Sequence, residues 1–214
     1  MKEDQREPVS IVVFASGRGS GFASIVSAIA AGRLRARVAC LVCDRAGAPV
    51  LQKARAAGIP TALVEPQGGS REAYDRRILQ AIQPYSPRFV VLAGFRRILS
   101  DVLLREFSSP EGYARVVNVH PSLLPAFPGL ESYRQAFAYG CKVTGVTVHL
   151  VDLDLDHGPI CAQESFAIDD CVSAEAVEAR GLAIEHRLYP ETLDWVVREE
   201  FALRGRSVER ARSH

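Results

Sequence analysis

Apolar runs and helical patterns alternate along the first half of the chain. Nearly continuous apolar runs predict buried strands at 9–16, 37–44, 60–65 and 88–94. Helical spacing or composition, ended by a stop signal such as glycine, predicts helices at 22–32, 48–57 and 70–83, the last capped by Ser70. Strands that are apolar at nearly every position are typical of a parallel sheet covered by helices on both faces.

The second half of the chain departs from this regular alternation. Residues 115–119 form a further short apolar run, and the alternating pattern of 142–151 predicts a strand with one polar face. Residues 160–168 follow a turn, and we expect them to pair back on 142–151 as a hairpin. A long helix is predicted at 173–198, with a kink or a restart at Pro190.

These elements predict a single α/β domain over residues 1–214. We expect a Rossmann-like open, mostly parallel sheet with helices on both faces and an antiparallel hairpin in the C-terminal half. Ligands of such sheets bind at the carboxyl ends of the strands, where this chain has 16–21, 94–99 and 118–129. The tail, 201–214, is mostly polar and basic, and we expect it to fray.

The composition is that of an ordinary globular protein and disfavours two classes of partner. Hydrophobic residues make up 48% of the 214 residues and charged residues 24%, with a net charge of +1. This balance gives no electrostatic footprint for nucleic acid or a membrane surface, and no apolar run approaches the ~20 residues of a membrane-spanning helix. An odd number of cysteines without framework spacing, behind a charged first segment, favours a cytoplasmic protein.

The segment NVHPSLLPAFPG (118–129) carries the first candidate chemistry. Asn118 and His120 stand at the end of an apolar strand, which needs neither of them for its packing. The prolines that follow can extend neither a strand ladder nor a helix, so they make a stiff loop. A rigid loop with an amide donor and a titratable imidazole is a reasonable place for catalysis.

Two further loops follow predicted strands and carry glycines or arginines. SGRGSG (16–21) opens a helix, where its glycines and free N–H groups can receive a phosphate. The spacing is neither G-x-G-x-x-G nor a Walker sequence, and a plain tight turn is the alternative. GFRRIL (94–99) places two arginines after a buried strand, where they either bind a carboxylate or phosphate or are solvated surface charges.

The acidic turn DLDLDHGP (152–159) is not a calcium loop. An EF-hand needs glycine at its sixth position and glutamate at its twelfth, where this chain has His157 and Gln163. A carboxylate in the turn can orient a nearby histidine, and solvated carboxylates are the alternative. His149, on the alternating strand, fits a hydrogen-bonded core residue better than a ligand. The histidines have no metal-ligand spacing with one another or with the cysteines, so no metal is expected.

At these residues the chain resembles the folate-dependent formyltransferases, and within them the glycinamide ribonucleotide formyltransferases of purine biosynthesis. NVHPSLLPAFPGL is similar to the central signature of the family, and LDHGP to the segment with its catalytic aspartate. The likeness covers nearly the whole chain, through SGRGS, SREAYD, VVLAGFRRILS, RQAF and EHRLYP. The total length and EHRLYP favour the purine enzymes within the group.

The resemblance implies transfer of a formyl group from 10-formyltetrahydrofolate, a co-substrate, to the amine of glycinamide ribonucleotide. The implied catalytic residues are Asn118, which donates to the developing oxyanion, protonated His120, which assists, and Asp156, which favours that protonated form. Small molecules are then the only expected partners, and the protein is expected to be a monomer or a homodimer without a metal.

The resemblance also implies which residues bind each substrate. It places the ribonucleotide at Gly19, Ser20, Gly21, Leu182 and Glu185, with Glu185 on the ribose hydroxyls. It places the folate at Arg71, Arg96, Arg97, Ile98, Leu99, Asn118, Asp152, Leu153, Asp154, Leu155 and Asp156. Arg71 and Arg97 would suit the glutamate tail. Residues 1–100 would form the nucleotide- and phosphate-binding half, and 101–200 the catalytic and folate-binding half.

Four positions depart from the pattern of the family. Gly21 stands where many relatives have asparagine, Leu182 where a polar or basic phosphate contact is expected, and Glu131 and Tyr133 replace histidines. These departures concern the acceptor more than the folate donor. The alternatives are hydrolysis of 10-formyltetrahydrofolate, formyl transfer to another amine such as methionyl-tRNA or an amino sugar, and a folate-binding module without catalysis.

Overall fold

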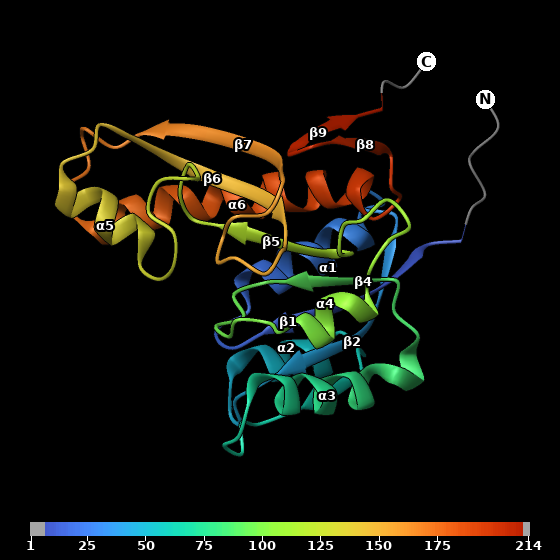
Figure 1. Cartoon of the computed structure of the whole chain (residues 1–214). Coiled ribbons are helices and arrows are strands. Elements are labelled where there is room, and N and C mark those ends of the chain that lie inside the picture. The colour runs from blue at the N-terminus through green and yellow to red at the C-terminus, as the bar shows by residue number, and fades with distance from the viewer. Residues whose placement is uncertain (1–6, 212–214) are drawn as a thin grey trace.

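The computed structural model describes residues 7–211, whose strands form one nine-stranded sheet in the order β3-β2-β1-β4-β5-β6-β7-β9-β8 (Figure 1). The strands are β1 (Val9–Ala15), β2 (Ala36–Cys43), β3 (Thr61–Leu63), β4 (Phe89–Leu92), β5 (Val116–His120), β6 (Val143–Leu150), β7 (Ile160–Ala167), β8 (Phe201–Arg204) and β9 (Ser207–Arg210). The helices are α1 (Ser20–Ala30), α2 (Pro49–Ala56), α3 (Arg71–Ile82), the short 3-10 helix η1 (Gln83–Tyr85), α4 (Asp101–Glu106), α5 (Ser132–Tyr139) and α6 (Ala174–Val196). The predicted Rossmann-like sheet with a C-terminal antiparallel hairpin is confirmed.

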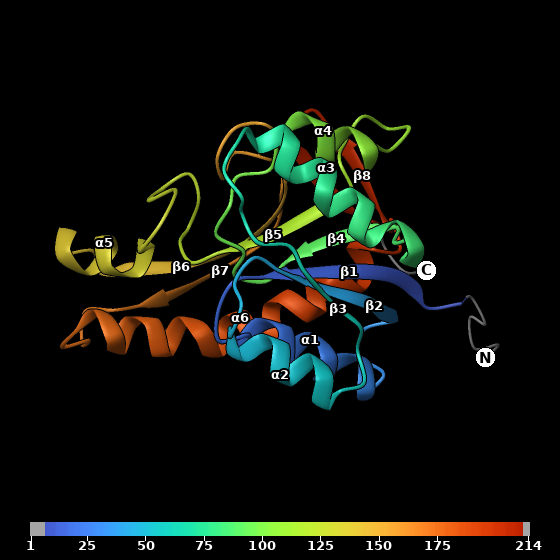
Figure 2. The same ribbon diagram turned by 90° about the horizontal axis from the view of Figure 1, so that it is seen from below.

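The strands of the first half are apolar on both faces because helices cover both faces. The strands from β3 to β5 pair in parallel, and Figure 2 shows α3 and α4 on one side of them and α1, α2 and α6 on the other. Within β1, Ile11 and Val13 belong to the core beneath α1 and α6. Val12 and Phe14 belong to the core beneath α3 and α4. Each strand therefore contributes alternate side chains to two separate cores.

The C-terminal segment corrects our expectation that residues 201–214 fray. β8 and β9 form an antiparallel hairpin, and β9 pairs with β7 at the edge of the sheet. The Phe201 ring packs between Tyr113 and Trp195, at centroid distances of 5.1 and 6.0 Å. The segment reads as polar because only one face of the hairpin packs on the protein. Residues 212–214 of this tail lie outside the described residues, as do 1–6 at the other end.

The helices agree with the sequence prediction in part. Ser70 caps α3, and its hydroxyl accepts a hydrogen bond from the N–H of Ala73 at 3.2 Å, as predicted. α6 continues through Pro190 as one helix and does not restart there. α4 and α5 have six and eight residues, too few to display a helical period, and the sequence did not indicate them. Among residues 7–211, no helix is both long enough and apolar enough to cross a membrane.

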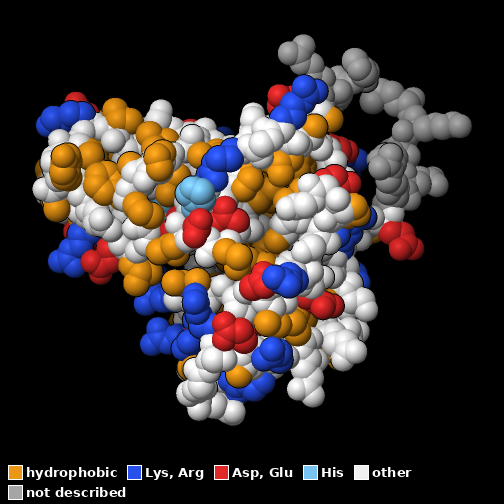
Figure 3. Space-filling model, in the orientation of Figure 1, with side chains coloured by type: hydrophobic (Ala, Val, Ile, Leu, Met, Phe, Trp, Pro, Cys, Tyr) orange, Lys and Arg blue, Asp and Glu red, His pale blue; other side chains and the backbone are white. Residues whose placement is uncertain are grey.

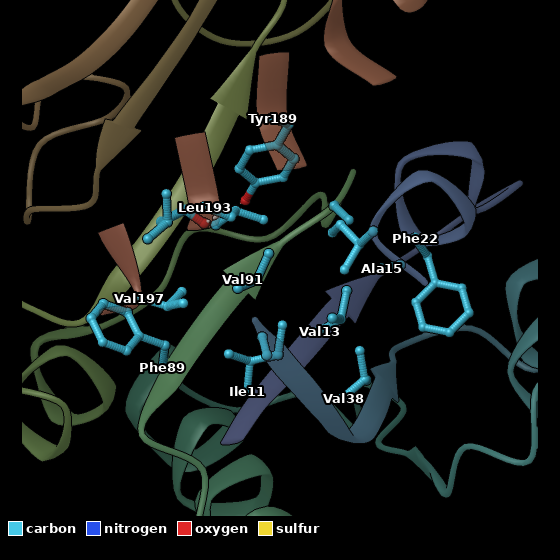
Figure 4. Close-up of a cluster of buried hydrophobic side chains, with 14 of the residues drawn as sticks. Ile11, Val13, Ala15, Phe22, Val38, Phe89, Val91, Tyr189, Leu193 and Val197 are labelled. Carbon is cyan, nitrogen blue, oxygen red and sulfur yellow. Dashed lines mark hydrogen bonds between the residues drawn. The ribbon is translucent and has the colours of Figure 1, made fainter. Parts of the chain in front are cut away.

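Tyr189 joins α6 to the two strands that carry the candidate site. Tyr189 is 1% exposed, and Figure 4 shows its ring beside Leu193 in the cluster of buried side chains. Its hydroxyl lies 3.0 Å from the carbonyl oxygens of both Leu92 and Val117. These carbonyls belong to β4 and β5. Since buried carbonyls need a hydrogen-bond donor, the hydroxyl contributes to holding the two strands and the helix together.

We expect Tyr189→Phe to lower the free energy of unfolding by about 1–2 kcal/mol, because two buried carbonyls lose a shared donor while the ring is kept. Urea denaturation followed by circular dichroism measures this. Tyr139→Phe is the matched control, since Tyr139 is 82% exposed. Equal unfolding midpoints for the two variants would show that the Tyr189 hydroxyl does not stabilise the fold.

Candidate active site

β5 lies at the boundary between the parallel and antiparallel parts of the sheet. It pairs with β4 in parallel and with β6 in antiparallel orientation. The second pairing places His149 opposite Asn118 and Thr147 opposite His120. Opposite residues project from the same face of a sheet, so these four side chains gather at the end of β5.

Asn118 and His149 are in direct contact. Nδ2 of Asn118 lies 3.2 Å from Nε2 of His149, and Nδ1 of His149 lies 2.8 Å from the carbonyl oxygen of Leu150. A carbonyl only accepts, so His149 donates from Nδ1 and accepts at Nε2. Burial lowers the pKa of His149, which favours this neutral form. The second N–H group of the Asn118 amide is left for a ligand.

The carboxylate of Asp156 lies between two histidines. Its Oδ2 is 3.3 Å from Nδ1 of His120, and its Oδ1 is 3.8 Å from Nε2 of His149. The backbone N–H of Gly129 donates to Oδ2 at 2.8 Å. Asp156 has a φ of 51°, in the left-handed region that L residues seldom adopt. The surrounding contacts hold the backbone in this conformation and aim the carboxylate at His120.

Both ring nitrogens of His120 face acceptors. Nε2 lies 2.9 Å from the carbonyl oxygen of Phe127 and 3.1 Å from Oγ of Ser132, while Nδ1 faces Asp156. A carbonyl and an ionised carboxylate only accept, so a proton on each nitrogen has a partner. The residue is 3% exposed. The surroundings of this imidazole therefore accommodate a positive charge.

The proline-rich loop after β5 is anchored to β6 and β7. The hydroxyl of Thr147 donates to the carbonyl of Ser122 at 2.7 Å and accepts from the N–H of Leu124 at 3.1 Å. Nε2 of Gln163 donates to the carbonyl of Leu124 at 3.0 Å and to the Thr147 hydroxyl at 2.9 Å. The loop is thus held by side chains of the hairpin as well as by its prolines.

The loop after β1 approaches α2 closely. Gly19 has a φ of 71°, and a Cβ at this position would lie 2.4 Å from Cγ2 of Val50, so only glycine fits. Within the described chain no side chain caps α1, and the N–H groups of its first turn, from Ser20 onward, are open to an anion. Nζ of Lys53 lies 3.4 Å from the Gly19 carbonyl and adds positive charge.

The N-terminal part of α6 faces the loop after β1. Arg18 in this loop forms an ion pair with Glu178 of α6 at 3.0 Å. Leu182 and Glu185 follow one and two turns later on the same side of the helix. Leu182 therefore presents an apolar side chain toward this region. A Cβ at Gly21 would meet its nearest neighbour at 3.6 Å, so the fold does not require glycine there.

Glu185 has an unusual environment for a carboxyl group. The hydroxyl of Tyr133, from α5, donates to its Oε1 at 2.9 Å. Burial raises the pKa of Glu185 to about 7, the hydrogen bond from Tyr133 opposes this rise, and the charge of Glu178 adds to it. The next residue, His186, has a buried Nε2 without a partner among residues 7–211. Burial and the nearby Lys53 charge lower the pKa of His186.

The loop after β4 lies beside the loop after β1 and contains two of the predicted arginines. The Ser16 hydroxyl accepts from the N–H of Arg96 at 3.1 Å, which joins the two loops. Nε of Arg97 lies 3.0 Å from Oδ2 of the buried Asp44, and its guanidinium lies 5.0 Å from the centre of the Tyr74 ring. Arg97 is therefore paired through Nε within the protein, although Arg96 and Arg97 are both exposed.

The other predicted folate residues differ in their exposure. Arg71 is exposed at the start of α3, and Ile98 is 48% exposed. Leu99 is 5% exposed and packs in the core beneath α3 and α4, so it can offer a ligand little beyond its backbone. Leu153 and Leu155 are 60% and 52% exposed beside Asp156. Exposed apolar side chains beside the candidate site suit an apolar ring of a ligand.

Asp152 and Asp154 shape the acidic turn and do not contact His120. Oδ1 of Asp152 accepts from the N–H of Asp154 at 3.0 Å, and its Oδ2 lies 3.4 Å from Nδ1 of His157. Arg206, in the β8–β9 turn, donates to the carbonyl of His157. Figure 3 shows acidic side chains beside a histidine on this face of the molecule. In the part of the chain that the structure describes, no cluster of His, Cys, Asp and Glu side chains could hold a metal ion.

Some residues at this site were not found from the sequence. His149 is buried and hydrogen-bonded, as predicted, but its partner is Asn118, which places it beside the candidate catalytic group. Thr147 and Gln163 anchor the loop and received no role. Thr147 and His149 share one face of an alternating strand, which was the available signal. The missing information was that this strand pairs with β5.

Comparison with known proteins identifies relatives of this chain. The profile of the Formyl transferase family matches residues 9–193. A phosphoribosylglycinamide formyltransferase from Bacillus subtilis (strain 168) is 39% identical over 182 residues, which are 85% of this chain and 91% of that protein. One from Mycobacterium tuberculosis (strain ATCC 25618 / H37Rv) is 42% identical, over 85% of this chain and 81% of its own length.

A solved structure extends the likeness to the fold. The crystal structure of glycinamide ribonucleotide transformylase 1 from Symbiobacterium toebii matches with a TM-score of 0.90 at 38% sequence identity. The match covers 96% of this chain and 95% of that one. By the extent of these matches, the chain belongs to the formyl transferase family.

Proposed function

We propose that the protein transfers a formyl group from 10-formyltetrahydrofolate to the amine of glycinamide ribonucleotide, a step of purine biosynthesis. The observation that carries the proposal is the Asp156 carboxylate, which faces His120 and His149 beside the amide of Asn118. Relatives named phosphoribosylglycinamide formyltransferase, at 39% and 42% identity, support this acceptor. All five cysteines are free, which suits the reducing cytoplasm.

Asn118 and His120 stabilise the charge that develops during transfer. When bound, the folate co-substrate supplies the formyl group. The amine attacks the formyl carbon, the bond from that carbon to N10 of the folate breaks, and N10 takes up a proton to balance the one that the amine loses, which leaves tetrahydrofolate. Negative charge builds on the formyl oxygen, and the free N–H of the Asn118 amide donates to it. His120 adds its positive charge at the same site. A donor of this kind contributes about 2.7–4 kcal/mol to stabilising a transition state.

Asp156 orients His120 and provides an acceptor next to it. Its carboxylate faces the ring, with Oδ2 3.3 Å from Nδ1. The same carboxylate can accept the proton that leaves the amine, directly or through a water molecule. His149 keeps the Asn118 amide in orientation, because its Nε2 accepts one of the two amide protons.

The ribonucleotide binds between the loop after β1 and α6. The open N–H groups of Ser20 and Gly21, the close turn at Gly19 and the charge of Lys53 suit its phosphate. Glu185 accepts hydrogen bonds from the ribose hydroxyls. Leu182 and Gly21 contribute shape and not charge, so binding of the phosphate depends on the backbone and Lys53.

The folate binds between the loop after β4 and the acidic turn. Ile98, Leu153 and Leu155 supply exposed apolar surface for the pterin ring. Arg71 and Arg96 are exposed and suit the carboxylates of the glutamate tail. Arg97 contacts Asp44 through Nε, so its terminal nitrogens can bind a carboxylate while that contact is kept. The folate lies along the backbone of Leu99, Asp152 and Asp154. Asn118 and Asp156 lie at the end where the reacting carbon binds.

A formyl-transfer assay with and without the ribonucleotide tests the proposal. We expect tetrahydrofolate to form from 10-formyltetrahydrofolate only when glycinamide ribonucleotide is present. Release of formate without the ribonucleotide would indicate the hydrolase instead. Folate binding without either product would indicate another amine as acceptor or a protein that only binds.

Removing the side chain of Asn118 or that of His120 is expected to reduce turnover strongly. His120→Ala and Asn118→Ala should each lower kcat by about 10²–10³-fold, because each removes stabilisation of the developing oxyanion. Isothermal titration should show that both variants still bind a folate analogue. Activity like that of the unmodified protein in His120→Ala would remove His120 from the mechanism.

Asp156→Asn is expected to lower kcat while folate binding is kept. The amide keeps the size of the side chain but removes the negative charge beside His120 and the acceptor for the proton of the amine. Asp169→Asn, an exposed substitution, is the control. A kcat like that of the unmodified protein in Asp156→Asn would show that this carboxylate takes no part in the transfer.

Glu185 is expected to make ribonucleotide binding depend on pH near neutrality. The pKa of Glu185 is raised to about 7 by burial, so the carboxyl becomes protonated as pH falls through that value. A protonated carboxyl is a weaker acceptor, and the KM for the ribonucleotide should therefore rise below pH 7. In Glu185→Gln we expect this dependence to vanish and the KM to be about tenfold higher at pH 8, with the folate KM unchanged. Equal changes in both KM values would contradict the assignment.

A further inference from the structure

Tyr133 stands where the family resemblance led us to expect histidine, and its hydroxyl donates a hydrogen bond to Glu185. The residue lies in the first turn of α5 and is 6% exposed. The hydroxyl donates to Oε1 of Glu185 at 2.9 Å. Burial and the neighbouring carboxylates raise the pKa of Tyr133 well above its usual value, so the hydroxyl keeps its proton and acts as a donor.

The opposite helix is shaped to receive this hydroxyl. A Cβ on Gly181 of α6 would lie 2.1 Å from Oη of Tyr133, so the hydroxyl occupies the space that any larger residue would fill. The ring is confined on another side by Phe166, at a centroid distance of 6.1 Å. Tyrosine at 133 and glycine at 181 are therefore complementary, and the position of the hydroxyl is fixed by packing.

The second oxygen of Glu185 is available to a ligand. Oε2 accepts no hydrogen bond from residues 7–211. It is also not a buried atom without a partner, as Nε2 of His186 is, so solvent reaches it. The charged groups around the carboxyl are few. Glu178 lies on the same helix and is paired with Arg18 of the loop after β1, and Lys53 of α2 faces His186.

We propose that Tyr133 is a positioning residue for the acceptor substrate: its hydroxyl holds Oε1 of Glu185 and thereby presents Oε2 to the ribose hydroxyls. This inference rests on the proposed function of Glu185. Tyr133 does not touch the ribonucleotide. It acts by limiting the rotation of a carboxylate that would otherwise have to be ordered on binding.

Tyr133→Phe removes the hydroxyl and keeps the ring that packs against Phe166. We expect the KM for glycinamide ribonucleotide to rise about fivefold to tenfold, with kcat at saturating ribonucleotide and the folate KM within about twofold of the unmodified protein. Tyr139→Phe on the same helix is the matched control, because Tyr139 is 82% exposed. It should match the unmodified protein in all three constants.

The pH dependence separates positioning from packing. The hydrogen bond from Tyr133 favours the ionised form of Glu185, so its loss should raise the pKa of that carboxyl. The pH below which the ribonucleotide KM rises should therefore be higher in Tyr133→Phe. A merely structural role would leave this pH unchanged and raise the KM of both substrates, a result that would overturn the proposal.

A double-mutant cycle with Glu185→Gln tests whether Tyr133 changes the ribonucleotide KM through Glu185. If Tyr133 acts through Glu185, the double variant should have no higher ribonucleotide KM than Glu185→Gln alone. A raised KM in Glu185→Gln with none in Tyr133→Phe would refute the role of Tyr133 and leave that of Glu185 intact. An unchanged KM in Glu185→Gln would instead refute the ribonucleotide site itself, and with it the inference.

Gly181→Ala tests the contact between Tyr133 and α6 from the side of α6. The added methyl group would meet the hydroxyl and the ring carbon Cζ of Tyr133, at 2.1 and 2.2 Å, and should displace both and raise the ribonucleotide KM. Tyr133→Phe removes the oxygen but keeps Cζ, so we expect the double variant to keep a lowered melting temperature and a ribonucleotide KM at least as high as that of Tyr133→Phe. A ribonucleotide KM like that of the unmodified protein in Gly181→Ala would contradict a positioning role for the hydroxyl.

Discussion

The carboxylate of Asp156 is the contact on which the candidate site depends. The side chain of Asp156 is only 9% exposed, and an ionised carboxylate with so little contact with water is unfavourable unless donors or positive charge surround it. Here the N–H of Gly129 and the ring of His120 meet one oxygen, while His149 lies near the other. These partners come from the loop after β5, from β5 itself and from β6. Holding one carboxylate therefore requires that the turn, the loop and two strands meet.

The change from parallel to antiparallel pairing at β5 makes this meeting possible. β6 runs antiparallel to β5, so Thr147 and His149, from its second half, lie opposite the carboxyl end of β5. Period-two alternation then places Asn118 and His120 beside His149 and Thr147 on one face. Tyr189 joins β5 to β4 from the opposite side through the carbonyls of Leu92 and Val117. The doubly covered half of the sheet is thus a rigid base for the loops that carry the chemistry.

Much of the fold could be predicted from the sequence, because its first half repeats a simple pattern. Apolar runs and helix caps such as Ser70 are local signals, and the strands and the parallel sheet followed from them. The hairpin at β8 and β9 could not, because its packing depends on Phe201 meeting Tyr113 and Trp195 from distant segments. Short helices and strand order are decided by tertiary contacts for the same reason.

The candidate site was predictable only where one segment carries the chemistry. The spacing of Asn118 and His120 and the acidic turn are visible in the chain, and the structure brings Asp156 to His120. The contact of His149 with Asn118 depends on strand pairing. The engagement of Arg97 with Asp44 depends on a buried carboxylate that the pattern does not reveal.

In the proposed site the two substrates meet at Asn118, His120 and Asp156. Gly21, Leu182 and Tyr133, where the family resemblance led us to expect other residues, all lie at the proposed acceptor end. The packing of Tyr133 against Gly181 shows that a second residue accommodates the tyrosine.

A crystal structure with glycinamide ribonucleotide and an unreactive folate analogue would test the central claim most directly. We expect the amine nitrogen to lie about 3–4 Å from the carbon that stands for the formyl group, with Asn118, His120 and Asp156 around them and the ribose on Glu185. An amine bound out of hydrogen-bond reach of all three residues would contradict the proposed site.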